Sequence, residues 1–188
     1  QSKFVTSKQK QKFDNFLRSL SLRKKDFCVH LANSAGTLRD PALHYDMVRV
    51  GLALYGYNPL KDFDEDLGLK PALSVKARIT LIREVPANVG VSYGHTFTTN
   101  RHSRLAVVAI GYADGVNRAL SGKFEVLANG NRLPQVGAIT MDQLVVDVTE
   151  RPEIHIGSIV TLLGPDGNDC ITPQEWSDLS HTIPWEVL

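Results

Sequence analysis

The sequence lacks several features that would place it in a specialised class of proteins. It holds two cysteines, Cys28 and Cys170, and no C-x-x-C pattern, so neither a disulfide scaffold nor a zinc site is expected. We expect Cys28 to be a small buried residue, Cys170 to be a free thiol in a turn, and the compartment to be a reducing cytoplasm. No run of about 18 apolar residues is present, and residues 1–4 carry no signal-peptide core.

An excess of one charge is also missing. Lys and Arg total 21 and Asp and Glu total 20, which leaves a net charge of +1 and no basic block. Nucleic acid and anionic membranes are therefore not expected as partners. The 188 residues are 43% hydrophobic and 22% charged, which is typical of a globular chain with one domain or two small ones.

The first sixty residues have an α/β pattern. Apolar spacing predicts a helix over residues 9–20, and short apolar runs predict strands over 27–31 and within 47–55. A second helix is expected at 37–44, so the order is that of a parallel α/β unit. Two strands and two helices cannot close a sheet, so we expect either that residues 1–60 are the remnant of a larger α/β domain or that another segment supplies the missing neighbours.

The pattern changes at residues 56–71, which carry four acids, Asp62, Asp64, Glu65 and Asp66, and which we expect to form a linker or a long loop. We expect residues 61–188 to form an all-β domain. Its predicted strands are 73–85, 105–110, 124–128, 135–139, 144–148 and 159–163. A helix is predicted at 172–179, with Thr172 as its N-cap and Glu175 completing a capping box.

Some residues combine chemistry with an unusual setting, and each has a second interpretation. Ser34 and Gly51 follow predicted parallel strands, where small residues bind phosphate or simply make a tight turn. Arg49 lies in an apolar run and needs either an ion-pair partner or a cavity. Tyr93 stands in a turn beside Gly94, where it either acts as an acid or base or is a packed surface residue. Met141 precedes Asp142 and is either a core residue or part of a site.

Taken together, several motifs resemble the C-terminal half of the alanine racemase family. They are A-N-S-A at 32–35, D-x-V-R-x-G-L-x-x-Y-G at 46–56, V-x-Y-G-x-x-F at 91–97, G-Y-A-D-G at 111–115, M-D-Q at 141–143 and T-I-x-W-E at 182–186. The resemblance implies that residues 1–60 are the end of a (β/α)₈ barrel that binds pyridoxal 5'-phosphate. It also implies that residues 61–188 are the family's C-terminal β domain.

The resemblance also implies roles for individual residues. The cofactor-binding residues would be Ser34, Arg49, Gly51, Leu52 and Trp185. Tyr93 would be one of two catalytic bases in the interconversion of L- and D-alanine, acting in the partner's site of a homodimer, and the backbone N–H of Met141 would bind the substrate carboxylate. Arg49 would face the pyridine nitrogen and keep it unprotonated. The activity would supply D-alanine for peptidoglycan in a bacterial cytoplasm.

Three positions depart from the family pattern. The family's cofactor-linked lysine falls before residue 1, and none of the ten lysines occupies a matching motif. Trp185 stands where many members have Tyr, and an indole N–H can donate but not accept a hydrogen bond. Ala138 stands where many members have Arg, next to an entrance corridor that would include Tyr112, Asp114 and Arg118.

Two other functions stay open at this point. One is a non-catalytic β module that kept the fold without the activity, which the missing lysine favours and the intact Tyr93, Arg49 and Met141 oppose. The other is a racemase of the same fold that acts on serine or another amino acid.

Overall fold

The chain folds as two compact units, residues 1–72 and 73–188. The computed structural model describes residues 3–20, 27–60 and 67–188. The division lies just after the linker predicted at 56–71, whose four acids fall outside the described residues. The family fold class inferred from the motifs, an α/β remnant followed by a β domain, is confirmed.

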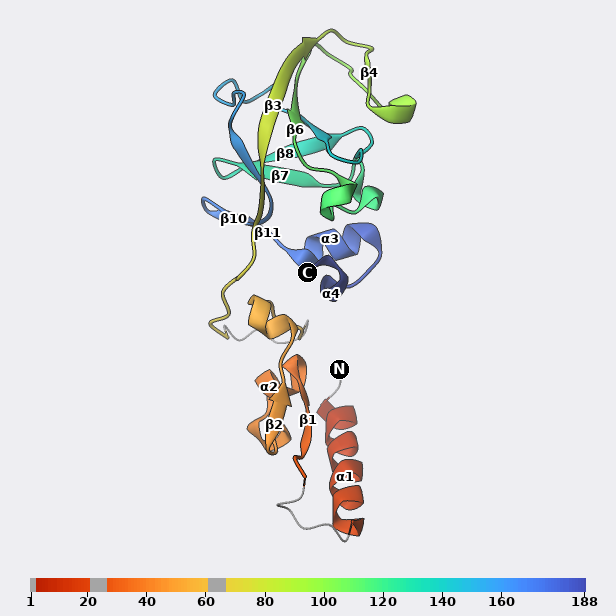
Figure 1. Cartoon of the computed structure of the whole chain (residues 1–188), viewed down its shortest axis with the longest axis vertical. Helices are drawn as coiled ribbons and strands as arrows, with labels where there is room; N and C mark the ends of the chain where they lie inside the picture. Colours follow the sequence, from red (N-terminus) through yellow and green to blue (C-terminus); the bar gives the residue numbers. More distant parts are fainter. Residues whose placement is uncertain (1–2, 21–26, 61–66) are drawn as a thin grey trace. The chain divides into compact units, whose positions relative to one another are not determined.

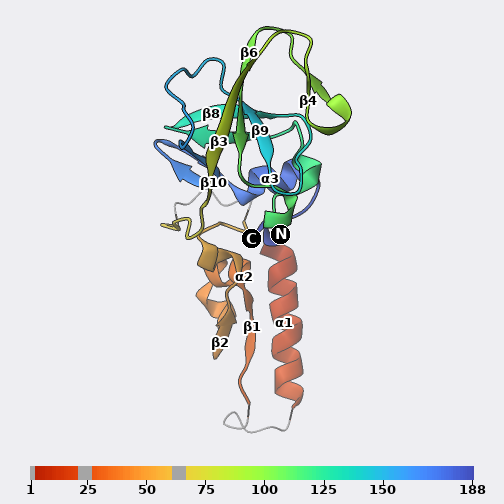
Figure 2. The same ribbon diagram turned by 45° about the horizontal axis from the view of Figure 1, so that its top comes forward.

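The first unit is built on two parallel strands (Figure 1). Helix α1 runs alongside them in both views (Figures 1 and 2). In chain order the elements are α1 (Lys3–Ser19), β1 (His30–Asn33), α2 (Ser34–Arg39), the 3₁₀ turn η2 (Pro41–Leu43), β2 (Met47–Arg49) and the 3₁₀ turn η3 (Leu52–Tyr55).

The helix predicted at 9–20 is confirmed, although it begins earlier, at Lys3. The helix predicted at 37–44 instead begins at Ser34, because the side chain of Asn33 accepts a hydrogen bond from the Gly36 N–H and caps the first turn. The apolar run at 47–55 is a strand only to Arg49. Beyond Gly51 it becomes a 3₁₀ turn.

The expectation that Cys28 is buried is wrong. Cys28 is exposed, whereas its neighbour Val29 is buried. Neighbouring side chains of an extended segment point to opposite sides, so the side chain that faces inward here is Val29.

The second unit is a closed antiparallel sheet (Figure 2). The strands follow the order β11-β10-β3-β6-β9-β8-β7, and an additional pairing of Thr161 with Leu127 joins β10 to β7. These strands are β3 (Val75–Val85), β6 (Ser103–Val108), β7 (Glu125–Ala128), β8 (Asn131–Val136), β9 (Leu144–Asp147), β10 (Ile159–Asp166) and β11 (Asp169–Ile171).

A small hairpin and two helices complete the second unit. The hairpin consists of β4 (Gly90–Val91) and β5 (Phe97–Thr98) and was not predicted. Helix α3 (Pro173–Ser180) follows Thr172, which caps it together with Glu175 as predicted, and α4 (Pro184–Val187) ends the chain. The strand predicted at 135–139 lies earlier, at 131–136, because the turn at Asn129–Gly130 pairs Ala128 with Asn131.

A continuous apolar core fills the closed sheet. Ile79, Leu127, Leu144 and Leu162 are almost fully buried in it, and Trp176 of α3 packs edge-on against Phe124 at the edge of the core. None of the helices in the described ranges is long and apolar enough to cross a membrane.

Candidate active site

Ser34 and Gly51 meet in the first unit, as the position of their motifs predicts. The Gly51 N–H donates to Ser34 Oγ over 2.8 Å, and the Ala53 N–H approaches the same oxygen at 3.4 Å. Ser34 is buried at the start of α2, and Gly51 lies just before η3. The two loops that follow the parallel strands therefore lie side by side.

Glycine at position 51 keeps space open beside the Ser34 hydroxyl. Among the described residues outside its chain neighbours, a Cβ added to Gly51 would have Ser34 Oγ, at 4.0 Å, as its one neighbour within van der Waals range. The first N–H groups of a helical turn have no intrahelical acceptor, and this applies to both α2 and η3. Because Ser34 Oγ accepts from the Gly51 and Ala53 N–H groups, its own proton stays available to donate, and a hydroxyl donor beside the amides of a helical turn suits a phosphate.

Arg49 extends from the end of β2 toward β1. Its Nη1 lies 2.5 Å from His30 Nδ1, and its Nη2 donates to the Leu31 carbonyl oxygen over 3.3 Å. An arginine is always a donor, so His30 Nδ1 must act as the acceptor and His30 is held in one tautomer. His30 was not identified from the sequence. The parallel pairing of β1 with β2 brings His30 to Arg49, so His30 could have been found only by predicting that pairing.

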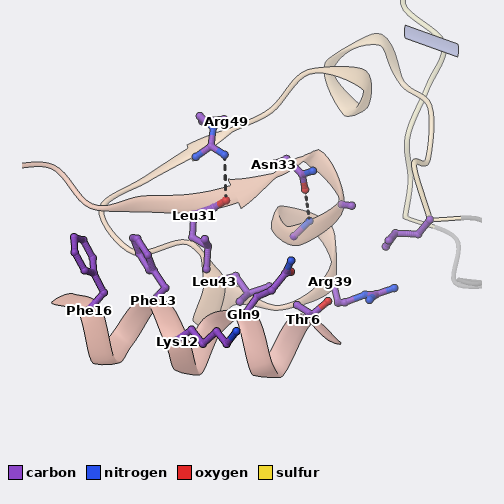
Figure 3. Close-up of a pocket in the computed structure, with 13 residues that line it drawn as sticks. Thr6, Gln9, Lys12, Phe13, Phe16, Leu31, Asn33, Arg39, Leu43 and Arg49 are labelled. Atoms are coloured by element: carbon purple, nitrogen blue, oxygen red, sulfur yellow. Dashed lines mark hydrogen bonds between the residues drawn. The ribbon is translucent and has the colours of Figure 1, made fainter. Parts of the chain in front are cut away.

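Arg49 also lines a cavity of about 590 Å³ between α1 and the strands (Figure 3). Phe13 and Phe16 extend from α1 into it, and one of the two dashed lines in Figure 3 marks the bond from Arg49 to Leu31. Three cationic residues line this cavity, which are Lys12, Arg39 and Arg49. Ser34, Gly51 and Leu52 are not among the residues that line this cavity.

A polar cluster ties α1 to the loop before β2. Asp14 accepts hydrogen bonds from Lys10 Nζ at 2.8 Å and from the Tyr45 hydroxyl at 2.5 Å. The hydrogen bond from Lys10 is the main cause that lowers the pKa of Asp14, and the same bond raises the pKa of Lys10. Burial is the main cause that raises the pKa of the Tyr45 hydroxyl, and the hydrogen bond to Asp14 raises it further. This cluster fixes the helix that carries one wall of the cavity.

Tyr93 lies in the turn η4 (Tyr93–His95), within the β4–β5 hairpin of the second unit. Its side chain is 75% exposed, and its hydroxyl has no hydrogen-bond partner in the described part of the chain. Before it, Ser92 Oγ donates to the Ala138 carbonyl oxygen over 2.7 Å. A Cβ on Gly137 would lie 2.8 Å from the Val91 carbonyl oxygen, so glycine there lets the hairpin approach closely.

Met141 is held next to the turn η5 (Tyr112–Asp114). The Tyr112 N–H donates to the Thr140 carbonyl oxygen over 3.0 Å, and the Ala113 N–H donates to that of Met141 over 2.8 Å. Gly111 permits this contact, because a Cβ there would lie 2.5 Å from the carbonyl carbon of Met141. The Met141 N–H has no partner among the residues that the structure describes, and its side chain is exposed rather than in the core.

Three motifs of the second unit line one hollow of about 680 Å³. Its lining includes Tyr93, Tyr112 and Met141, together with Ser92 and Gln143. Three large side chains that line it are exposed, at 75% for Tyr93, 58% for Met141 and 42% for Tyr112. The motifs at 91–97, 111–115 and 141–143 thus converge, although they are far apart in the sequence.

Of the remaining candidate residues of the second unit, Ala138 also lines this hollow, whereas Trp185, Asp114 and Arg118 are not among its lining residues. Trp185 belongs to α4 and is 52% exposed. Asp114 accepts a hydrogen bond from the Gly111 N–H over 2.9 Å and so shapes the η5 turn. Arg118 is exposed at the start of the turn η6 (Arg118–Leu120). Ala138 is buried, and its carbonyl receives the bond from Ser92. Across the described ranges, no His, Cys, Asp or Glu cluster suits a metal.

The chain thus combines an α/β segment that carries Ser34, Arg49 and Gly51 with a closed β domain that carries Tyr93 and Met141. Residues 1–59 match the model of the alanine racemase N-terminal domain, and residues 72–188 match that of the alanine racemase C-terminal domain. The chain belongs to the alanine racemase family.

Individual relatives agree with this assignment. An alanine racemase of Prochlorococcus marinus is 64% identical over 188 residues, which is 100% of this chain and 49% of the relative. The crystal structure of alanine racemase from E. faecalis superposes with a TM-score of 0.88 at 36% identity, covering 99% of this chain and 49% of that one. The alanine racemase of Bartonella henselae with covalently bound pyridoxal phosphate gives a TM-score of 0.86 at 36% identity, covering 97% and 48%. The chain spans about half the length of these relatives.

Proposed function

We propose that this chain supplies the C-terminal half of a pyridoxal-phosphate-dependent alanine racemase, which interconverts L- and D-alanine. The observation that carries the proposal is the hollow that brings Tyr93 and the unpartnered N–H of Met141 together. A base and a carboxylate donor on one surface are what proton exchange at Cα of an amino acid requires. In the cell, the D-alanine formed would serve peptidoglycan synthesis in the cytoplasm.

Ser34, Gly51 and Leu52 are proposed to hold the phosphate of the cofactor. The support is the space beside Gly51, where Ser34 Oγ accepts from the Gly51 and Ala53 N–H groups and so keeps its own proton to donate to a phosphate. Trp185 could add a single indole N–H to that phosphate. When bound, the cofactor supplies an electron sink that makes the Cα proton of the amino acid removable.

Arg49 is proposed to face the pyridine nitrogen of the cofactor. Its bonds to His30 Nδ1 and the Leu31 carbonyl oxygen hold the guanidinium in place at the end of β2. Because arginine does not release its proton, it would keep the ring nitrogen unprotonated. A weaker electron sink favours simple proton exchange over side reactions.

Tyr93 is proposed to remove and return the Cα proton on one face of the substrate, in the site of a partner copy within a homodimer. Racemisation requires an acid/base group on each face, and the family's lysine would serve the other face. Tyr112, Asp114 and Arg118 would line the route to the site. With Ala138 in place of an arginine, this route would carry less positive charge.

The test is a Tyr93→Phe substitution in a full-length enzyme that contains this segment. Exchange of the Cα proton is measured in deuterated water, separately with L- and D-alanine. We expect the enantiomer that Tyr93 serves to lose exchange by about 10²-fold or more, which is the contribution typical of a positioned acid or base, while the other retains it. Tyr55→Phe, at an exposed tyrosine of the first unit, is the control.

Two results would contradict this role of Tyr93. Equal loss of both exchanges, or loss of neither, would show that it is not a base for one face. The same measurement with L- and D-serine decides whether alanine is the preferred substrate. Absence of exchange with any amino acid in the unsubstituted enzyme would favour the non-catalytic alternative.

A further inference from the structure

The turn that presents Tyr93 has an unfavourable backbone conformation. Ser92 has φ 60° and ψ −170°, and His95 has φ 47°, whereas Gly94 adopts its φ of 71° without a steric penalty. Residues other than glycine rarely occupy these regions unless surrounding contacts hold them there. The hydroxyl of Tyr93 has no partner within the described residues, and the backbone of this turn sets the direction of the Cα–Cβ bond from which the phenol extends.

The segment before Tyr93 is held by contacts already described, from Ser92 to Ala138 and from Val91 to Gly137. The segment after it depends on His95. The imidazole of His95 occupies the place where residue 90 would carry a side chain. A Cβ on Gly90 would lie 2.6 Å from His95 Nδ1 and 2.8 Å from His95 Cβ, and it would also overlap Cγ.

This packing closes the hairpin across its turn. Gly90 pairs with Thr98 at the base of the hairpin, and His95 folds back from the turn onto Gly90. The contact involves the Cβ of His95 as well as the ring, so a methyl group at position 90 cannot be accommodated by rotating the imidazole alone. It would displace the backbone of the turn, two residues from Tyr93.

We propose that His95, packed on Gly90, is a positioning residue that holds the Tyr93 phenol in its catalytic orientation. The inference rests on the proposed role of Tyr93 as a base for one substrate face. His95 itself does not touch the substrate. It acts by keeping the turn in the one conformation that aims Tyr93, and the effect of its loss is therefore confined to the face that Tyr93 serves.

The test uses three variants of the full-length enzyme, Gly90→Ala, His95→Gly and the double variant. Gly90→Ala should lower exchange on the Tyr93 face by about tenfold or more, since a misplacement near 1 Å can cost up to 10²-fold, with less than a twofold change on the other face. His95→Gly should lower it severalfold, because glycine accepts the φ of 47° but leaves the space over Gly90 empty. In the double variant the methyl group has room, and we expect it to exchange faster than Gly90→Ala alone.

Fluorine NMR of this 188-residue chain, labelled with 3-fluorotyrosine, gives a readout independent of activity. The chain has five tyrosines, and the Tyr93 signal is assigned from its loss in Tyr93→Phe. In Gly90→Ala and His95→Gly this signal should shift or broaden while the other four stay in place. His102→Ala is the matched control, because His102 is an exposed histidine of the same unit that faces Glu84 at 3.6 Å. It should leave both readouts unchanged.

Several outcomes would overturn the proposal. Equal loss on both faces in Gly90→Ala would mean that the contact merely stabilises the hairpin, and unchanged exchange on both faces would mean that it does not position Tyr93. A Tyr93 fluorine signal that does not respond would also refute it. If Tyr93→Phe itself shows no one-face loss, the proposed function fails, and the fluorine signal still decides whether His95 holds Tyr93.

Discussion

The two units of this chain differ in how each holds its share of the site. In the described part of the first unit, the buried apolar side chains are few, namely Val29, Ala32, Leu43, Leu52 and Leu60. The second unit has a closed sheet around a continuous core. Ser34 and Arg49 are nevertheless held in place, because hydrogen bonds rather than core packing fix their side chains. A site can thus be locally specified in a unit that buries little apolar surface.

The largest effect is expected when the two units are produced as separate chains. A chain of residues 73–188 should fold and unfold cooperatively, because its core and its closed sheet lie within that range. A chain of residues 1–72 should show no cooperative transition, since a segment of this size that buries few apolar side chains cannot offset its conformational entropy. Circular dichroism during heating measures both. A cooperative transition for residues 1–72 would contradict the contrast.

A matched pair of leucine substitutions in the whole chain sharpens the contrast. Leu162 is fully buried in the core of the second unit, and Leu43 is buried in the first. Leu162→Ala should lower the free energy of unfolding of the second unit by about 2–5 kcal/mol. Leu43→Ala should leave that transition unchanged, because the two leucines belong to different units. Urea unfolding followed by tryptophan fluorescence checks this, because both tryptophans, Trp176 and Trp185, belong to the second unit, and equal shifts would show that the units unfold as one.

The two thiols provide a smaller comparison. Cys28 in the first unit is exposed, whereas Cys170 in the second is partly buried. Burial is the main cause that raises the pKa of the Cys170 thiol, and the negative charges of Glu175 and Asp169 raise it further. Since the thiolate is the reactive form, a disulfide reagent at pH 8 should modify Cys28 about tenfold faster than Cys170. In Cys28→Ser the fast phase should vanish and the slow phase remain. Two equal rates would mean that Cys170 is as accessible as Cys28.

The sequence predicted those features whose cause is local. Thr172 and Glu175 lie three residues apart and cap α3 as their spacing predicts. The motif around Tyr93 marked that residue without showing how it is held. His30 beside Arg49, Ser92 bonded to Ala138, and His95 packed on Gly90 depend on strand pairing or turn geometry. The β4–β5 hairpin has strands too short to leave a periodic pattern, so it could not be predicted.

The smallest expected effect concerns an exposed ionic cluster on the second unit. Arg132 donates to both carboxylate oxygens of Asp169, at 2.7 and 3.0 Å, and to Glu175 at 2.8 Å. The hydrogen bonds from Arg132 are the main cause that lowers the pKa of Asp169. A carboxyl group whose folded-state pKa lies below its unfolded value stabilises the fold above that unfolded value, and this stabilisation is lost as the pH falls through the folded-state pKa.

Arg132→Gln should therefore lower the urea midpoint of the second unit at pH 7, and only modestly because the cluster is exposed to solvent. The gap between the parent chain and the variant should stay constant down to about pH 4, the ordinary range of an aspartate, and shrink below it. Arg83→Gln, at an exposed arginine of β3 with no ion pair among the described residues, is the control and should produce no such gap. A gap for Arg132→Gln that persists unchanged at pH 2 would show that Arg132 stabilises the unit through packing of its side chain rather than through the charge of Asp169.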